Sequence, residues 1–352
     1  MPVDKIKVPH DPRISLRSAH LNGTTYGYLY SPASTAKRGT IFLVHGFPDL
    51  SMGWRYQIPF LTSLGLDVVA VDCIGYGRTD APPFKTQDYT YRRAADDLAE
   101  LARQLGLSQI ILGGHDWGGA IVYRVAQYYP TLIQAVFSIC TPYFAPSDKY
   151  EPLGILVQKR LPNFAYQLQF ASGQIEEAVQ SAAEIRQFLN AMYGGRSAAP
   201  DPKPVFDVDR GIDVARLSRV GKTKLLDDDE MDYYVAEYGR HGIHGPLNWY
   251  RNREDNFMNE WRDFFRSGQK PAAQAPTIKQ EVLFVLATRD QALKPFMAER
   301  MGERIPNLTR REVSASHWAL WERPEECNRL IGEWLHQKVF DKDSDRSREN
   351  KL

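Results

Sequence analysis

Short, nearly uninterrupted apolar segments recur along the first 140 residues and constrain the fold more than any other feature of the chain. Between them, apolar residues recur at helical spacing, as in residues 91–106 and 117–129. Strands that are hydrophobic on both faces are typical of a parallel sheet covered by helices on both sides. The alternation therefore predicts an α/β protein with a doubly wound, mostly parallel sheet. The expected strands are residues 40–47, 67–75, 109–116 and 133–140.

This alternation stops after residue 141 and resumes near residue 276. The intervening residues contain mostly helical patterns, such as 227–242, and loops rich in Pro, Gly and Asp. Apolar segments at 281–290 and 308–316 then restore the order of strand and helix. We therefore expect an α/β core that is interrupted by a helical cap domain. The predicted division is a first core part at 1–141, a cap at 142–275, a second core part at 276–338 and a charged tail at 339–352.

A sharp turn from strand to helix is predicted at residues 113–120, GGHDWGGA. Asp116 at its centre is flanked by Gly114 and Gly118, which permit a strained central residue and a close approach of the helix to the strand. This pattern is typical of the nucleophile elbow of the α/β-hydrolase fold, where the central residue is usually serine. Glycine-rich turns also occur in nucleotide-binding folds, but this segment lacks the spacing of a phosphate-binding loop. We interpret Asp116 as a nucleophile whose charge is stabilised by a helix N-terminus.

In this fold, an acid and then a histidine follow the nucleophile along the chain. Asp290 ends one predicted strand and His317 follows another, which places both at the edge of the sheet where doubly wound folds form their sites. Each residue alone would suit a helix cap or a core histidine. Their order downstream of the elbow favours a general base, His317, that is oriented by Asp290.

An aspartate nucleophile selects substrates that are displaced at a saturated carbon. Attack by serine would leave an ether, whereas attack by Asp116 leaves an ester that water activated by His317 can hydrolyse. The backbone N–H groups of Phe47, in LVHGFPD, and of Trp117 are predicted to form the oxyanion hole for this hydrolysis. Epoxides and alkyl halides both fit this chemistry. An epoxide additionally needs a proton donor for its oxygen, a role that suits tyrosine.

Nearly the whole chain resembles the α/β-hydrolase-fold epoxide hydrolases of the soluble and fungal type, through GTIFLVHGFPD, AVDCIGYGRTDAP, GGHDWGGA, FVLATRD and SASHWALWERPE. Two further segments resemble the proton-donor segments of that family: FAYQLQF, which carries Tyr166, and GPLNWYRN, which carries Tyr250. The resemblance implies that both hydroxyls hold the epoxide oxygen and that one of them protonates it. Gln169 departs from the family pattern, in which an aromatic residue is frequent at that position.

Two other functions fit part of the pattern. The core motifs are shared with dehalogenases, so a haloalkane or haloacid dehalogenase with the same aspartate nucleophile is the main alternative, with Trp117 as a halide donor. The paired tyrosine segments favour an epoxide over a halide. A non-catalytic ligand receptor on the same fold is the second alternative, and the intact set of candidate catalytic residues argues against it. The sequence leaves open the natural epoxide, the stereoselectivity and the choice between detoxification and biosynthesis.

Composition narrows the expected partners and location. The chain has 44 basic and 43 acidic residues, so its net charge of +1 gives no electrostatic reason to bind nucleic acid. No apolar run is long enough for a membrane span, and three scattered cysteines predict neither a disulfide framework nor a zinc site. We expect no cofactor or metal, and a small epoxide and water as the partners; the oligomeric state has no sequence signal. A cytoplasmic location is expected, because the polar start MPVDKIKVPHDP is not typical of a signal peptide and the few cysteines fit a reducing compartment. The C-terminal Asn-Lys-Leu resembles a peroxisomal signal only weakly.

Overall fold

The structure is a computed structural model that describes residues 3–83, 85–197, 203–266 and 275–341. The C-terminal Asn-Lys-Leu, considered above as a targeting signal, lies outside these ranges, as does the middle of residues 194–204, one of the segments rich in Gly and Pro that are expected to form loops. Within the described ranges, no helix combines the length and the apolar character needed to cross a bilayer.

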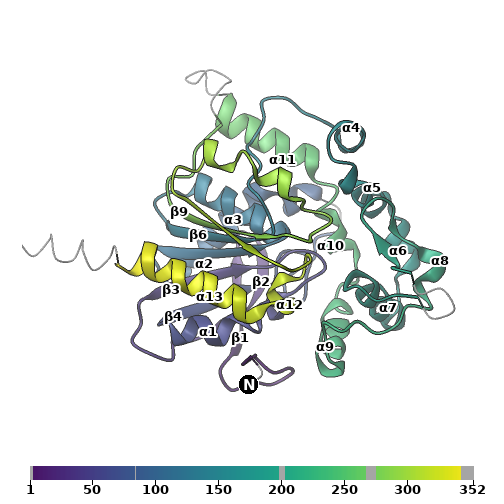
Figure 1. The fold of residues 1–352 in the computed structure, drawn as a ribbon, viewed down its shortest axis with the longest axis horizontal. Helices are drawn as coiled ribbons and strands as arrows, with labels where there is room; N and C mark the ends of the chain where they lie inside the picture. Colours follow the sequence, from purple (N-terminus) through teal and green to yellow (C-terminus); the bar gives the residue numbers. More distant parts are fainter. Residues whose placement is uncertain (1–2, 84, 198–202, 267–274, 342–352) are drawn as a thin grey trace, which may run out of the picture.

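The centre of the molecule is an eight-stranded sheet in the order β1-β2-β4-β3-β5-β6-β9-β10 (Figure 1). The strands from β4 to β10 pair in parallel, whereas β1 and β2 form an antiparallel hairpin that joins the sheet through β4. The predicted mostly parallel α/β sheet is therefore confirmed, and the hairpin is an addition that the sequence pattern did not indicate. The strands are β1 (Ser15–Leu21), β2 (Thr24–Ser31), β3 (Gly39–Val44), β4 (Leu66–Val71), β5 (Ile110–His115), β6 (Ile133–Ile139), β9 (Glu281–Ala287) and β10 (Leu308–Val313).

Helices cover both faces of this sheet. On one face α1 (Gln57–Ser63) packs against α13 (Pro324–Leu335), and on the other α2 (Tyr91–Gln104) packs against α3 (Trp117–Tyr128) (Figure 1). Every residue of β4 and of β5 is consequently buried. This burial explains why these strands are apolar without a polar alternate face.

The chain between β6 and β9 is mostly helical and lies on the side of the sheet where the parallel strands have their carboxyl ends (Figure 1). It contacts the loops at the carboxyl ends of the strands: the hydroxyl of Tyr193 donates to the carbonyl of Pro48 at 2.6 Å, and the indole N–H of Trp249 donates to that of Ile74 at 3.1 Å. Its helices are α4 (Leu153–Lys159), α5 (Tyr166–Ser172), α6 (Gln174–Ala178), α7 (Ala182–Met192), α8 (Val214–Leu217), α9 (Asp228–Tyr238), α10 (His244–Asn248) and α11 (Arg253–Glu260), with a short strand pair β7 (Phe206–Asp207) and β8 (Gly211–Ile212).

Capping explains where two of these helices begin. Ser181 and Glu184 form a capping box at the start of α7, and Asp227 and Glu230 form another at the start of α9. In each box the first side chain accepts a hydrogen bond from the N–H of the acid, and the acid accepts one from the first residue's own N–H. The predicted helix at 227–242 is thus real but ends earlier, at Tyr238, directly before Gly239.

The C-terminal boundary of the core requires a correction. After α13 the helix continues through His336–Phe340, and both Val339 and Phe340 are buried. The guanidinium of Arg38 lies 3.8 Å from the centre of the Phe340 ring. The prediction that a charged tail begins at residue 339 is therefore wrong for these two residues, because two apolar side chains next to a charged segment still pack against the core.

Candidate active site

Asp116 lies at the turn between β5 and α3, with a backbone φ of 53°. This conformation is unusual for a residue other than glycine and marks a strained position. The surrounding backbone leaves no room for larger neighbours: a Cβ atom on Gly118 would lie 1.9 Å from the carbonyl oxygen of Val44, and one on Gly114 would lie 2.4 Å from the carbonyl oxygen of Gly118. The glycines thus allow the turn to present the Asp116 carboxylate at the carboxyl end of β5.

Two backbone N–H groups hold this carboxylate. The N–H of Phe47, in the loop after β3, donates to Oδ1 of Asp116 at 2.7 Å, and the N–H of Trp117 also donates to the carboxylate. The hydroxyl of Thr141 donates to the backbone carbonyl of Asp116 at 2.8 Å and so helps to hold the turn in place. The two predicted oxyanion donors therefore converge on the side chain of the predicted nucleophile.

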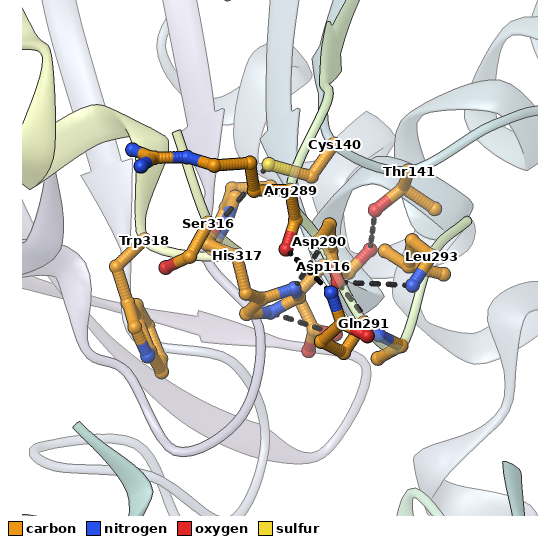
Figure 2. A network of polar contacts seen from close by, with 12 residues as sticks. Asp116, Cys140, Thr141, Arg289, Asp290, Gln291, Leu293, Ser316, His317 and Trp318 are labelled. Atoms are coloured by element: carbon orange, nitrogen blue, oxygen red, sulfur yellow. Dashed lines mark hydrogen bonds and ion pairs between the residues drawn. The ribbon is translucent and has the colours of Figure 1, made fainter. Parts of the chain in front are cut away.

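His317 connects the two acidic residues of the site (Figure 2). Its Nδ1 lies 2.7 Å from Oδ2 of Asp290, and its Nε2 lies 3.5 Å from Oδ2 of Asp116. Asp290 is held in turn by the N–H groups of Ala292 and Leu293, which donate to its Oδ1 at 2.8 and 3.0 Å. Because Asp290 binds Nδ1, the ring presents Nε2 toward Asp116.

Charge and burial shift the pKa values of all three groups. Burial disfavours the imidazolium of His317, but the carboxylates of Asp290 and Asp116 outweigh this and raise its pKa to about 9. Burial also raises the pKa of Asp116, an effect that the positive charge of His317 partly offsets. For Asp290 the balance is reversed: burial favours protonation, yet His317 and the backbone N–H groups keep its pKa below the usual value. These shifts favour an imidazolium at His317 that is paired with an ionised Asp290.

The raised pKa of His317 predicts a loss of stability at alkaline pH. His317 binds its proton more tightly in the folded protein (pKa about 9) than in the unfolded chain (ordinary pKa 6.5). The contribution of this proton to the free energy of unfolding is therefore complete below pH 6.5 and is lost as the pH rises through 9. It amounts to at most about 3 kcal/mol. Urea unfolding between about pH 6 and pH 10 is expected to show a falling free energy of unfolding, with a flatter profile for His317→Gln. The same slope in both proteins would contradict the assignment.

Tyr166 begins α5 and Tyr250 follows α10, and the two buried rings lie with their centres 6.1 Å apart. The ring of Tyr250 packs edge-on against the rings of Phe47 and Trp117, with ring centres 5.1 and 5.3 Å apart, and so lies beside the two residues whose N–H groups hold Asp116. Burial raises the pKa of both phenols, which keeps them protonated at neutral pH. Together with Asp116 and Trp117, they line a cavity of about 700 Å³.

The seven residues selected from the sequence therefore lie together in space, although their catalytic roles remain predictions. Two further histidines have structural partners: His115 contacts the backbone carbonyl of His317 through Nε2 at 2.8 Å, and Nε2 of His45 accepts the N–H of Cys73 at 2.9 Å. Among the described residues, no group of three or more His, Cys, Asp or Glu is placed to hold a metal ion.

Sequence reasoning missed the groups that hold the loop carrying Phe47. The hydroxyl of Tyr234 donates to Oδ1 of Asp49 at 2.6 Å, and that of Tyr193 binds the preceding carbonyl of Pro48. Asp49 is fully buried, and this burial raises its pKa to about 7. The acid directly after HGFP was a usable signal. The two tyrosines were not, because they come from α9 and from the end of α7, far along the chain.

The fold and this arrangement define an α/β hydrolase, and the alpha/beta hydrolase fold family matches residues 39–324. "Epoxide hydrolase srdG" of Neurospora crassa is 40% identical over 94% of this chain and 97% of its own length. "Bifunctional epoxide hydrolase 2" of Sus scrofa is 34% identical over 84% of this chain, which spans about half (51%) of that larger protein. The crystal structure of epoxide hydrolase A from Mycobacterium thermoresistibile is 27% identical and superposes with a TM-score of 0.74, covering 93% of this chain and 99% of that one. The chain belongs to the epoxide hydrolases of the α/β-hydrolase fold.

Proposed function

We propose that this protein hydrolyses an epoxide to a vicinal diol through a covalent ester on Asp116. The observation that carries the proposal is the position of one carboxylate between two sets of groups: the N–H groups of Phe47 and Trp117 on one side, and the cavity lined by Tyr166 and Tyr250 on the other. Residues 142–275 act in this proposal as the cap domain, since they supply both tyrosines.

In the first step, Asp116 attacks an epoxide carbon and the C–O bond of the ring breaks. Oδ1 is held by Phe47, so Oδ2 is the oxygen that forms the new ester bond. The departing oxygen remains on the substrate and takes the phenolic proton of Tyr166 or Tyr250. Alkylation removes the negative charge of Asp116, one of the charges that hold the proton on His317. The imidazolium then loses its proton, which returns through solvent to the tyrosinate.

In the second step, the neutral His317 takes a proton from water while the water oxygen adds to Cγ of Asp116. Phe47 and Trp117 donate hydrogen bonds to the oxyanion that forms on this carbon. The ester C–O bond then breaks, and the leaving diol oxygen takes the proton of the new carboxyl group. Asp116 is again a carboxylate and His317 again an imidazolium, so one epoxide and one water give one diol and the free enzyme.

The tyrosine roles predict a selective loss of ring opening. In the Tyr166→Phe/Tyr250→Phe variant, alkylation is expected to slow by about 10²-fold or more, because the ring oxygen would leave as an unprotonated alkoxide. Hydrolysis of the ester should change little. Rapid-quench mass measurements of the alkyl-enzyme, with 1,2-epoxybutane as substrate, separate the two steps. Tyr129→Phe is a matched control, because this hydroxyl binds Asp96 outside the site. Wild-type ring opening by the double variant would show that another group protonates the oxygen.

A further inference from the structure

The cavity continues past the catalytic residues along helix α3. Asp116, Ala120 and Arg124 are spaced by four residues, so they lie on one face of the helix, and all three line the cavity. One face of α11 forms the opposite wall, through residues that also recur at helical spacing: Arg253, Asn256, Phe257 and Glu260. The cavity thus includes a channel between two helices that reaches from the Asp116 carboxylate to Arg124.

The residues that line this cavity differ in exposure. Phe144, Tyr150 and Phe296 line it and are exposed to solvent. Its wall also contains an ion pair between Arg124 and Glu260, whose Nε and Oε1 atoms are 2.6 Å apart and whose side chains are only 7% and 10% exposed. The cavity therefore combines exposed aromatic side chains with a buried charged pair.

Arg124 retains hydrogen-bonding capacity toward the channel. Its Nε donates to Glu260, and its Nη1 donates to the side-chain oxygen of Gln127 at 3.3 Å. The guanidinium lies 5.6 Å from the ring centre of Tyr91 and 5.7 Å from that of Tyr143. A guanidinium has five N–H groups, so three are left for a ligand in the channel.

We propose that this part of the cavity wall, formed by Arg124, Glu260, Tyr91 and Tyr143, is a subsite for a hydrogen-bond-accepting oxygen of the substrate. The proposal rests on the proposed function and specifies its substrate class: an epoxide that carries a hydroxyl or carboxylate at its far end. Arg124 lies eight positions after Asp116 along α3, a rise of about 12 Å along the helix axis. Since both side chains occupy part of this span, the epoxide and the oxygen are roughly 6–10 Å apart.

An entirely apolar substrate tail would bind weakly next to Arg124. It would remove water from the free N–H groups of Arg124 without replacing the hydrogen bonds that they lose. An oxygen acceptor restores one or two of those bonds at the same place. The charge on the guanidinium strengthens them further.

Three eight-carbon epoxides test the subsite directly: 1,2-epoxyoctane, 7,8-epoxyoctan-1-ol and 7,8-epoxyoctanoic acid. The expected result is a kcat/KM for the alcohol or the acid that exceeds that of epoxyoctane by about tenfold or more. The alcohol and the acid distinguish a neutral from an anionic acceptor, and preference for either supports the subsite. An equal or higher kcat/KM for epoxyoctane would overturn it.

The Arg124→Met/Glu260→Gln variant removes both charges at once, so that neither is left buried without its partner. The preference for the oxygenated substrate should then fall by about tenfold or more. Arg103→Met/Glu100→Gln makes the same two changes in an exposed pair of α2 and should keep the wild-type preference. An unchanged preference in the Arg124→Met/Glu260→Gln variant would contradict the proposal.

A second variant covers the case in which the first does not fold. Ala120→Leu leaves the ion pair intact and narrows the channel between the nucleophile and Arg124, so kcat/KM should fall more for the eight-carbon epoxides than for 1,2-epoxybutane. Equal losses for both would argue against the channel. Turnover of 1,2-epoxybutane by the wild-type protein tests the proposed function separately, because this short substrate does not reach Arg124.

Discussion

The Asp116→Asn variant is expected to lose epoxide turnover, with kcat reduced by about 10⁴-fold or more. The amide is nearly the same size as the carboxylate and can still accept the N–H of Phe47, so the turn should keep its shape. What it lacks is the negative charge that makes the side chain a nucleophile. Diol formation from 1,2-epoxybutane measures the effect, and Asp229→Asn, on the exposed first turn of α9, is a matched control.

The same variant has a second readout that a purely structural role would not produce. The carboxylate of Asp116 lies 3.5 Å from Nε2 of His317 and helps to raise the pKa of that ring to about 9. Its replacement by an amide should lower this pKa, as followed by NMR titration of the imidazole. The mass of the variant must be verified during the assay, because an amide at this position can itself be hydrolysed to aspartate. Full turnover by a verified Asp116→Asn protein would contradict the account.

The His317→Gln variant is expected to stop after the first step. Ring opening needs the carboxylate of Asp116, whereas hydrolysis of the ester needs a base, so the alkyl-enzyme should accumulate with a mass increase equal to one substrate molecule. The rate of ester hydrolysis should fall by about 10²–10⁴-fold. His20→Gln, on the exposed strand β1, is the matched control and should show no accumulation.

Ring opening in His317→Gln should also change its pH dependence. The positive charge of His317 lowers the pKa of Asp116 against the effect of burial, so the loss of this charge should raise the pKa of Asp116 further. Alkylation in the variant should therefore require a higher pH than in the wild-type protein. Single-turnover alkylation rates between about pH 5 and pH 9 measure the shift. Ring opening and hydrolysis that decline in parallel, with no adduct, would exclude a role confined to the second step.

The catalytic core was predictable because its signals are local. The Asp116 turn is defined by its flanking glycines, and Asp290 and His317 each follow an apolar strand, where parallel strands bring side chains to one edge. The hairpin β1–β2 lacked such a signal: β1, SLRSAHL, is a mostly exposed edge strand with several polar residues, so no apolar run marks it. Polar edge strands depend on pairing with a neighbour, which the local sequence does not reveal.

Contacts between distant segments were beyond local reasoning for a different reason. Arg124 and Glu260 are 136 positions apart. Taken alone, each is a charged residue in a helical segment, which is typical of a solvent-exposed helix face. The bond between Tyr234 and Asp49 crosses 185 positions. Only the packing of the helical segment over the sheet brings these partners together. Tyr166 and Tyr250 could still be predicted as site residues, because the segments that carry them resemble those of a known family.

The origin of the diol oxygen tests the covalent ester on Asp116 most directly. A single turnover with excess enzyme in ¹⁸O-labelled water should release a diol without label, because the added oxygen comes from the Asp116 carboxylate. The label should instead appear in the peptide that contains Asp116, since water replaces the oxygen that leaves with the product. A labelled diol in the first turnover, together with an unlabelled Asp116 peptide, would mean that water attacks the epoxide itself and would contradict the mechanism.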